Sequence, residues 1–396
     1  MKYDLVFKGG GAKGMVFVGA CEEFFDRGHA FGRLLGTSAG AITATLLAAG
    51  YSAREMLDAL VEKGPDGKSV FAGFMGLPPP FTDEELRASA TQKLLDAVDL
   101  TFVPDLVQQR LHEMLLKRLS ASEQFRHVLA FIERGGWFTA DRFISWFSEK
   151  MDAGSWGGGP RAFSGLTLAQ FFAATNTELS MVASDTTDGK MLVLNHTTAP
   201  DCPVVWAVRM SMSIPLLWDE VLWRAEWGNY LGRDVTGHAI VDGGLLSNFP
   251  IELFISDAPQ IARLMGAKTA NQILGMLIDE KLAVTKGLFV KFNIKPGDLE
   301  TVQRLERLVE TATGAHDKMV MDEYAHLVVH LPAAGYGTTE FDMSDERRRA
   351  LVSAGREAMA MYLDTPGGLV LPMETKARLH GVALTRADAL AIGLLE

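Results

Sequence analysis

The chain has few of the residues that hold metal ions or covalent cross-links. It contains 2 cysteines among 396 residues, Cys21 and Cys202. Cys21 falls in an apolar segment with helical spacing and Cys202 precedes a proline, so a disulfide framework is not expected and a reducing compartment is favoured. The 9 histidines do not cluster, and neither Cys-x-x-Cys nor His-Glu-x-x-His occurs. The sequence therefore predicts no metal site and no cofactor.

Positive charge is also scarce. The chain has 38 lysines and arginines against 49 aspartates and glutamates, a net charge of −11, which argues against a nucleic-acid partner. An anionic membrane would repel such a protein unless a local basic patch or apolar rim binds it. No apolar run reaches membrane-spanning length, and Met1-Lys2 leads directly into a strand pattern with no signal-peptide segment. We therefore expect a cytoplasmic protein, although secretion that needs no cleavable signal stays open.

The sequence does contain two glycine-rich turns near its N-terminus. Gly9 to Gly14 (GGGAKG) and Gly36 to Gly40 (GTSAG) each follow a short apolar run and precede a run with helical spacing. A Gly-x-Ser-x-Gly between a strand and a helix is typical of a nucleophile elbow, here with Ser38 as the nucleophile. Consecutive glycines at a helix start expose backbone N–H groups that can hold a developing oxyanion. Either turn alone would be a weak signal, but the pair predicts acyl-transfer chemistry.

These motifs resemble those of the patatin-like phospholipases. A third signature of that family is Asp-Gly-Gly far downstream, and Asp242-Gly243-Gly244 stands in the stretch AIVDGGLLSNFP. The segment from Val205 to Val221 is similar to the family's arginine- and serine-rich block, in which Arg209, Ser211 and Ser213 resemble positions beside the active site. Glu340 to Leu363 is similar to its closing segment. The motifs cover residues 3–256, and the looser likeness extends to about 365.

The resemblance implies a Ser–Asp dyad of Ser38 and Asp242. Asp242 follows a predicted strand, Ala239 to Val241, at the edge where α/β sheets place their ligands. An aspartate with an ordinary pKa near 3.9 is a weak base for a hydroxyl, so the site must contribute desolvation and oxyanion stabilisation. The nearest histidine, His238, is the competing base, but a role at a strand edge or in a loop is favoured.

The resemblance also assigns the surrounding residues. It implies that Gly9, Gly10 and Gly11 form the oxyanion hole and that Lys13 orients this loop or neutralises charge. The remaining supporting positions are the small residues of the two other motifs: Gly36, Gly40, Gly243 and Gly244. A phosphate-binding P-loop fails on spacing, because Gly14 rather than Ser or Thr follows Lys13. A dinucleotide site would fit Gly9, Gly11 and Gly14 but would leave the elbow at Ser38 unexplained.

The expected fold is α/β, a three-layer α/β/α sandwich of patatin type with a nucleophile elbow. We predict a catalytic domain over residues 1–365 and a C-terminal appendage over 366–396. Within the domain, residues 64–160 form a helical, aromatic-rich insert, with helices near 83–99, 104–133 and 139–151. This insert packs its aromatics inward or caps the active site. Its best candidates for an exposed apolar loop are Phe71, Phe74, Met75, Leu77 and Phe81.

Strand patterns return after the insert, at Leu179–Ala183, Lys190–Asn195 and Ile273–Ile278, with a last one at Val328–Leu331. Helical patterns follow at about 298–325 and 344–363. The function predicted is a phospholipase A or lysophospholipase acting on a phospholipid or another acyl ester at a transient membrane surface. The alternatives are a membrane-damaging effector that a protein or small-molecule activator switches on, and a non-catalytic lipid-binding protein.

Overall fold

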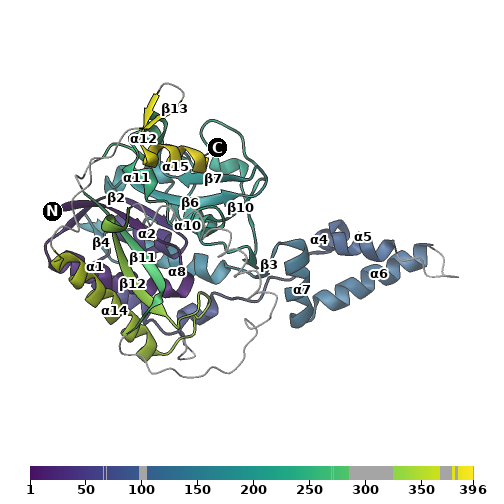
Figure 1. Ribbon diagram of the computed structural model, residues 1–396. Helices are drawn as coiled ribbons and strands as arrows, with labels where there is room; N and C mark the ends of the chain where they lie inside the picture. The colour runs from purple at the N-terminus through teal and green to yellow at the C-terminus, as the bar shows by residue number, and fades with distance from the viewer. Residues whose placement is uncertain are drawn as a thin grey trace.

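A computed structural model describes residues 1–65, 67, 69–97, 105–268, 270, 272–284, 324–365, 377–379 and 382–395. It has a globular α/β body from which a slender helical arm projects (Figure 1). Within the described residues, no helix is both long and apolar enough to cross a membrane.

The body is built on one sheet of eight strands. Its strand order is β12 (Val328–Ala334), β11 (Gln272–Ala283), β1 (Lys2–Phe7), β2 (Ala30–Thr37), β6 (Leu179–Asp185), β10 (Ala239–Asp242) and β9 (Val221–Leu222), and β7 (Lys190–Leu194) pairs with β6. The strands from β12 to β6 are parallel to their neighbours, whereas β7, β10 and β9 are added in antiparallel fashion. The strands predicted in the sequence are thus confirmed.

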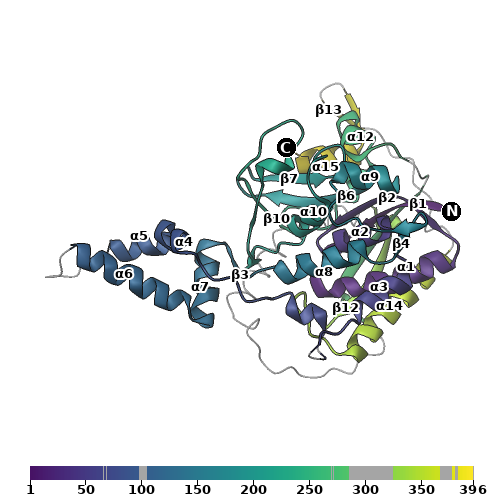
Figure 2. The same cartoon turned by 180° about the vertical axis from the view of Figure 1, so that it is seen from behind.

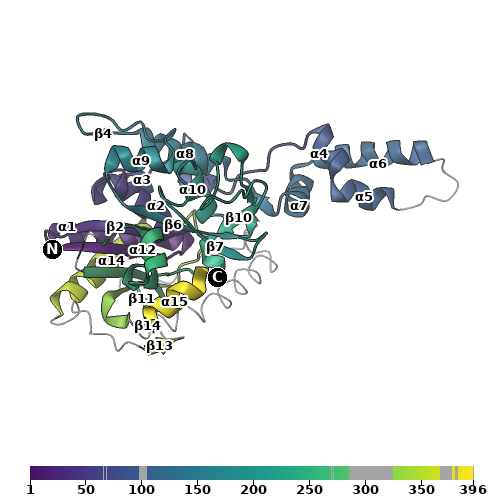
Figure 3. The same cartoon turned by 90° about the horizontal axis from the view of Figure 1, so that it is seen from above.

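Helices cover both faces of this sheet, because its parallel strands are apolar on both sides. In β1, Tyr3, Leu5 and Phe7 join one apolar cluster, and Val6 joins the other. The first cluster is covered by α1 (Val16–Asp26), α2 (Ala39–Ala48), α3 (Ala53–Leu60), α8 (Asp141–Asp152), α10 (Val204–Ser211) and α14 (Asp345–Asp364). The second lies under α11 (Glu252–Ile255), α12 (Pro259–Met265) and α15 (Arg386–Leu395). The molecule is therefore a three-layer α/β/α sandwich, as predicted (Figure 3).

The pairing of β6 brings two distant parts of the chain together. The last residue of β2, Thr37, pairs with Val182 of β6, and the last residue of β10, Asp242, pairs with the next residue, Ala183. Since β7 occupies the other edge of β6, β2 and β10 approach each other head-on along one edge. The residue after β2 and the end of β10 must therefore lie close together.

The insert separates into two parts with different surroundings. The arm contains α4 (Asp83–Ala88), α5 (Ala90–Asp96), α6 (Asp105–Ser120) and α7 (Glu123–Glu133), and it stands clear of the body (Figures 1 and 2). Its helices match the predicted ones, except that Ser89 and the pair at 121–122 divide the first two patterns. The remaining part, the 3-10 turn η2 (Val70–Gly73) and α8, packs on the main core.

The expected exposed apolar loop is not found as predicted. Phe71 and Phe74 are buried against Phe143 and Trp146 of α8, because four aromatic rings gain more from packing together than from lying singly on the surface. Of the five candidates only Leu77 is exposed. The strand β3 (Gly136–Phe138), which follows the arm, pairs with β8 (Leu216–Trp218) and ties the arm to the body.

Short elements complete the chain: the 3-10 turns η1 (Gly11–Met15), η3 (Ala225–Trp227), η4 (Gly243–Leu245) and η6 (Ala325–Leu327), the helix α9 (Leu168–Thr175), and the hairpins β4 (Ser155–Trp156) with β5 (Gly159–Pro160) and β13 (Ala377–Leu379) with β14 (Val382–Leu384). The helix predicted near 298–325 falls almost entirely outside the described residues. In the C-terminal stretch, Asp388 of α15 accepts hydrogen bonds from Ser256 Oγ and from the amides of Asp257 and Ala258. The domain boundary at residue 365 stays a prediction.

Candidate active site

Ser38 occupies a strained turn between β2 and α2. Its backbone has φ 54° and ψ −121°, a conformation that residues with a Cβ rarely adopt. The turn is held by a hydrogen bond from the Ser38 amide to Ser211 Oγ, at 3.0 Å. The Ser38 side chain thereby stands at the C-terminal edge of the parallel sheet, where the strand-turn-helix pattern of the sequence places it.

Two of the predicted supporting glycines allow this turn to form. A Cβ on Gly40 would lie 2.2 Å from the carbonyl oxygen of Phe7, and one on Gly36 would lie 2.3 Å from the backbone of Gly40. Neither position has room for a methyl group, so α2 can approach the sheet only because both residues are glycine. The same head-on packing places Gly243 against the carbonyl oxygen of Val182.

Asp242 lies at the end of β10 with 4% of its surface exposed. Its Oδ1 accepts a hydrogen bond from the Gly244 amide at 2.7 Å, whereas Oδ2 has no hydrogen-bond partner among the described residues. The Ser38 hydroxyl is near enough to favour the ionised carboxylate. The serine thus lies near the Asp242 carboxylate without a closed hydrogen bond to Oδ2, as is common for catalytic pairs before substrate binds.

The environment of Asp242 makes its carboxylate a stronger base than usual. Burial is the dominant influence and raises the pKa of Asp242 from 3.8 to about 7, although the Ser38 hydroxyl and the Gly244 amide act in the opposite direction. A carboxyl group with this pKa is ionised for about half the time at neutral pH, and it can then accept a proton from a hydroxyl group.

The loop of Gly9, Gly10 and Gly11 faces Ser38, but its three amides are not equivalent. The Gly9 amide donates to the carbonyl oxygen of Asn248 at 3.0 Å, so it is not available to an oxyanion, contrary to the prediction for this residue. Gly9 instead leaves room for the Asn248 side chain, because a Cβ on Gly9 would lie 2.0 Å from Asn248 Oδ1 and 3.1 Å from the Ser38 Cβ. Among the described residues, the amides of Gly10 and Gly11 donate to no acceptor.

The other end of this loop is fixed by two contacts. Lys13 is buried and forms an ion pair with Glu280 of β11. The Ala12 amide donates to the carbonyl oxygen of Thr338 at 2.8 Å. The first contact anchors the loop to β11 and the second to the turn after β12, while an orienting role of Lys13 stays a prediction. Nothing in the sequence indicates the contact with Thr338.

Residues 209–213, which follow β7 in the chain, form hydrogen bonds that hold the site, and the sequence alone does not predict these bonds. Ser211 Oγ accepts the Ser38 amide and donates to the Val182 carbonyl oxygen at 2.6 Å. The carbonyl oxygen of Ser213 accepts the Asp242 amide at 2.8 Å. One short stretch therefore holds both halves of the predicted dyad. Arg209, in the same block, pairs with Asp219 at 2.7 Å and hydrogen-bonds to Ser213 Oγ.

Replacement of Ser211 by alanine is expected to destabilise the fold. The change leaves the Ser38 amide and the Val182 carbonyl without their buried partner, and such losses cost roughly 2 kcal/mol together. Urea denaturation measures the effect on the free energy of unfolding. The matched control is Ser353→Ala, which removes only a hydrogen bond to Glu357 on the half-buried side of α14 and is expected to change stability by less than about 0.5 kcal/mol. Equal effects of the two substitutions would contradict the assigned role.

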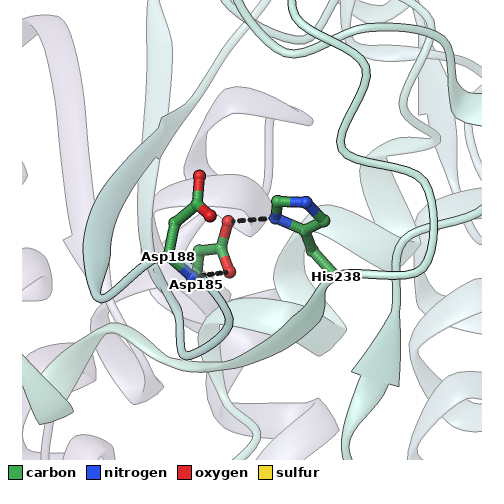
Figure 4. A group of neighbouring side chains, drawn as sticks. All are labelled: Asp185, Asp188 and His238. Atoms are coloured by element: carbon green, nitrogen blue, oxygen red, sulfur yellow. Dashed lines mark hydrogen bonds and ion pairs between the residues drawn. The ribbon is translucent and has the colours of Figure 1, made fainter.

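His238 does not compete with Asp242 for Ser38. It stands just before β10, at the opposite end of that strand from Asp242, and its Nδ1 lies 2.7 Å from Asp185 Oδ2 (Figure 4). Asp185, Asp188 and His238 offer ligand atoms within 4.8 Å of one another. However, Arg233 already pairs with Asp188, and the other Asp185 oxygen accepts the amides of residues 187 and 188. These contacts fit a closed hairpin turn better than a cation site.

A deep apolar pocket opens at Ser38. Its volume, measured out to its open mouth, is about 730 Å³. The wall begins at the glycine loop with Gly11 and Ala12 and follows α2 through Ala39, Ile42 and Leu46, so it extends about 12 Å from the serine. The other side is formed by aromatic residues in the part of the insert that packs on the main core, around η2 and α8: Phe71, Phe74, Phe143 and Trp146. Such a pocket suits a hydrocarbon chain rather than a polar ligand.

Comparison with known protein families gives a match for this chain. The family model described as patatin-like phospholipase matches residues 5–255, which is more than half of the chain. The chain belongs to this family. The matched region runs from β1 to α11 and contains every predicted site residue. Membership supports lipid acyl hydrolysis in the broad sense.

The individual proteins that this patatin-like protein resembles share less than a third of its residues. The uncharacterised protein YqhO of Bacillus subtilis (strain 168) is 29% identical over 370 residues, covering 92% of this chain and 98% of YqhO. Among solved structures, VipD from Legionella pneumophila is 18% identical with a TM-score of 0.44, and the type III effector ExoU is 16% identical with a TM-score of 0.35. Each comparison covers 91% of this chain, but the chain spans only 66% of VipD and 53% of ExoU.

Proposed function

We propose that this protein is a serine acyl hydrolase of phospholipase A or lysophospholipase type. The observation that carries the proposal is the head-on meeting of the strand ends at Ser38 and Asp242, beside an apolar pocket that Ser38 lines. Neither residue helps the fold to pack. The strained backbone of Ser38 and the buried Asp242 carboxylate, whose Oδ2 has no partner among the described residues, both lower the free energy of unfolding. Such costs are typical of catalytic groups.

In the proposed first step, Ser38 Oγ attacks the carbonyl carbon of an acyl ester. The Ser38 proton passes to Asp242 Oδ2 and then to the oxygen of the leaving alcohol as the ester bond breaks. The amides of Gly10 and Gly11 hold the negative charge on the carbonyl oxygen, helped by the start of the helical segment that follows. The products are the free alcohol and an acyl ester of Ser38.

In the second step, water attacks the acyl-enzyme. Asp242 accepts a proton from the water, and the same proton then returns to Ser38 Oγ as the fatty acid leaves. The dyad needs no histidine, because burial already brings the pKa of Asp242 close to neutrality. Both steps use the same oxyanion amides.

The shape of the pocket supports a long acyl chain as the part of the substrate that is recognised. Apart from backbone and the hydroxyls of Ser38 and Thr43, its lining is apolar. Burial of each methylene group contributes about 0.8 kcal/mol, so chains long enough to reach Leu46 gain affinity over short ones. A phospholipid or lysophospholipid offers such a chain next to its ester.

Filling the pocket is expected to change chain-length preference. Leu46→Phe adds volume at the far part of the α2 wall, so we expect the ratio of kcat/KM for a C16 ester to that for a C4 ester to fall by roughly tenfold or more. The short ester is the internal control, because it ends before Leu46 and its turnover reports intact folding. If the ratio stays constant, acyl chains do not occupy this pocket.

The proposal is tested by acyl release and by covalent labelling of the same protein. Wild-type protein is incubated with vesicles of mixed phospholipids and the released fatty acids are identified by mass spectrometry. A fluorophosphonate probe is then applied, and peptide mapping locates the adduct. Release of fatty acid together with an adduct on Ser38 supports the proposal. Absence of an adduct at Ser38 would refute it.

Three further expectations, an activator, a non-catalytic role and a cytoplasmic location, are tested by separate measurements. An activator of protein or small-molecule type stays a prediction, and it is tested by comparing turnover of the purified protein with and without cell extract. Labelling of Ser38 without turnover would favour such an activator. A non-catalytic lipid-binding role predicts that Ser38→Ala leaves the biological function unchanged. A cytoplasmic location with transient membrane contact is proposed as well, and fractionation of cells tests it.

A further inference from the structure

The helical arm has an unusual distribution of polar and apolar side chains. Among the described residues of the arm, its apolar core consists of Leu86, Leu116 and Leu129, with Phe81 and Leu95 packed against them. Polar residues are buried beside this core: Ser89, Gln92, Gln108, His112 and Ser120. Large apolar residues lie outside instead. A water-soluble helix normally turns its apolar face inward, so the outer face of the arm needs a partner.

The exposed apolar residues form stripes on two helices. On α6 they are Val107, Leu111, Met114 and Leu115, and on α7 they are Phe125, Val128 and Ile132; all seven are between 38% and 62% exposed. Spacings of three and four residues place each set along one side of its helix. Isolated surface leucines are common, whereas aligned rows on neighbouring helices mark a binding surface.

We propose that these two stripes dock the arm on a phospholipid surface. Basic side chains border the stripe of α6: Arg110 and Arg118 each lie one turn from Met114, and both are exposed. Over residues 109–120, α6 carries Arg110, Lys117 and Arg118 against the single acidic residue Glu113, and Lys117 pairs with Asp83 of α4, so Arg110 and Arg118 are the basic groups at this face. An apolar face bordered by long basic side chains is the pattern of a helix that lies in a lipid interface, with its charges at the phosphate level.

The arm is attached to the body beside the pocket at Ser38. The arm leaves the body just after Phe74 and returns through β3. Phe74 lines the pocket at Ser38, and β3 pairs with β8, whose Trp218 also lines it. Trp218 Nε1 donates to the Phe74 carbonyl oxygen at 3.2 Å, which joins the two attachment points. An arm seated on a lipid surface would therefore hold the pocket wall beside its substrate, an inference that rests on the proposed function for the nature of that substrate.

The overall charge of the protein determines which lipids the arm is expected to bind. A net charge of −11 opposes approach to strongly anionic membranes, so the apolar stripes must supply most of the affinity. Binding is therefore expected on zwitterionic phosphatidylcholine vesicles, and it should change little with salt, because screening weakens charge interactions and leaves apolar burial intact.

The test is vesicle flotation of the full-length chain carrying Ser38→Ala, which prevents consumption of the lipid. The arm variant adds Leu111→Gln, Met114→Gln and Leu115→Gln, all at exposed positions that do not support the fold. The matched control adds Leu222→Gln and Met361→Gln, which are exposed apolar residues of the body. We expect the arm variant to lose phosphatidylcholine binding by at least about tenfold and the control to keep it.

Further readouts separate the other outcomes. Equal binding by the arm variant and the control would overturn the proposal. So would sedimentation showing that wild type is a dimer which the arm variant dissociates, since the stripes would then be a subunit interface. With Ser38 restored, the arm variant should hydrolyse a soluble short-chain ester at the wild-type rate. If wild type hydrolyses no ester at all, the proposed enzymatic function fails, while flotation still decides whether the arm binds lipid.

Discussion

Replacement of Asp242 by asparagine is expected to abolish turnover and to stabilise the folded protein above neutral pH. Asparagine keeps an oxygen that can accept the Gly244 amide but cannot accept a proton from Ser38. It also removes a charge that is buried with one unpaired oxygen. We expect kcat to fall by on the order of 10⁴-fold, as for the loss of other catalytic bases.

The stabilisation has a definite dependence on pH. The folded-state pKa of Asp242, about 7, lies above its ordinary value of 3.8, so the folded state binds more protons than the unfolded state between these values. This group therefore lowers the free energy of unfolding as the pH rises towards 7. The advantage of Asp242→Asn should be close to zero near pH 4 and reach at most about 4 kcal/mol near pH 8. Urea denaturation at a series of pH values measures it.

Two observations bear on this prediction independently. The kcat/KM of wild type should rise with pH up to about 7, because only the ionised carboxylate accepts the Ser38 proton. As a control, Asp364→Asn changes an exposed aspartate that pairs with Arg27, so it should be neutral or slightly destabilising near pH 8. A stability gain for Asp242→Asn that does not vary with pH would show that the carboxylate is not the cause.

The second large effect concerns Ser38, where activity and stability again move in opposite directions. Both Ser38→Ala and Ser38→Gly remove the nucleophile, and we expect each to lower kcat by on the order of 10⁴-fold or more. Only glycine relieves the backbone strain at φ 54°. Ser38→Gly should therefore be more stable than Ser38→Ala by roughly 1 kcal/mol, after allowance for the greater freedom of glycine in the unfolded chain.

Thermal and urea unfolding of the two variants measure this difference. The comparison between alanine and glycine needs no correction for the lost hydroxyl, because both lack it. A matched pair at Ser353, which lies in the regular helix α14, should show the opposite order, with alanine more stable than glycine by roughly 1 kcal/mol. If glycine is also the less stable residue at position 38, the turn carries no strain in solution.

Much of this protein is determined by local sequence. Glycines at 36 and 40 around Ser38, between an apolar run and a helix former, specify the elbow because few other residues fit that turn. Apolar runs such as Tyr3–Phe7 specify buried strands, and the structure confirms them. The sandwich follows, since strands that are apolar on both faces require helices on both sides. The family resemblance drawn from the same motifs is likewise confirmed.

Only the tertiary structure decides how distant segments meet. That Asp242 lies beside Ser38 depends on both β2 and β10 using one edge of β6, and no local pattern fixes this register. The same holds for the Asn248 carbonyl that occupies the Gly9 amide and for the burial of Phe71 and Phe74. The outward apolar stripes of the arm also appear only in three dimensions. Burial and pairing depend on contacts between residues far apart in the chain, whereas sequence periodicity reports only which faces of one element are apolar.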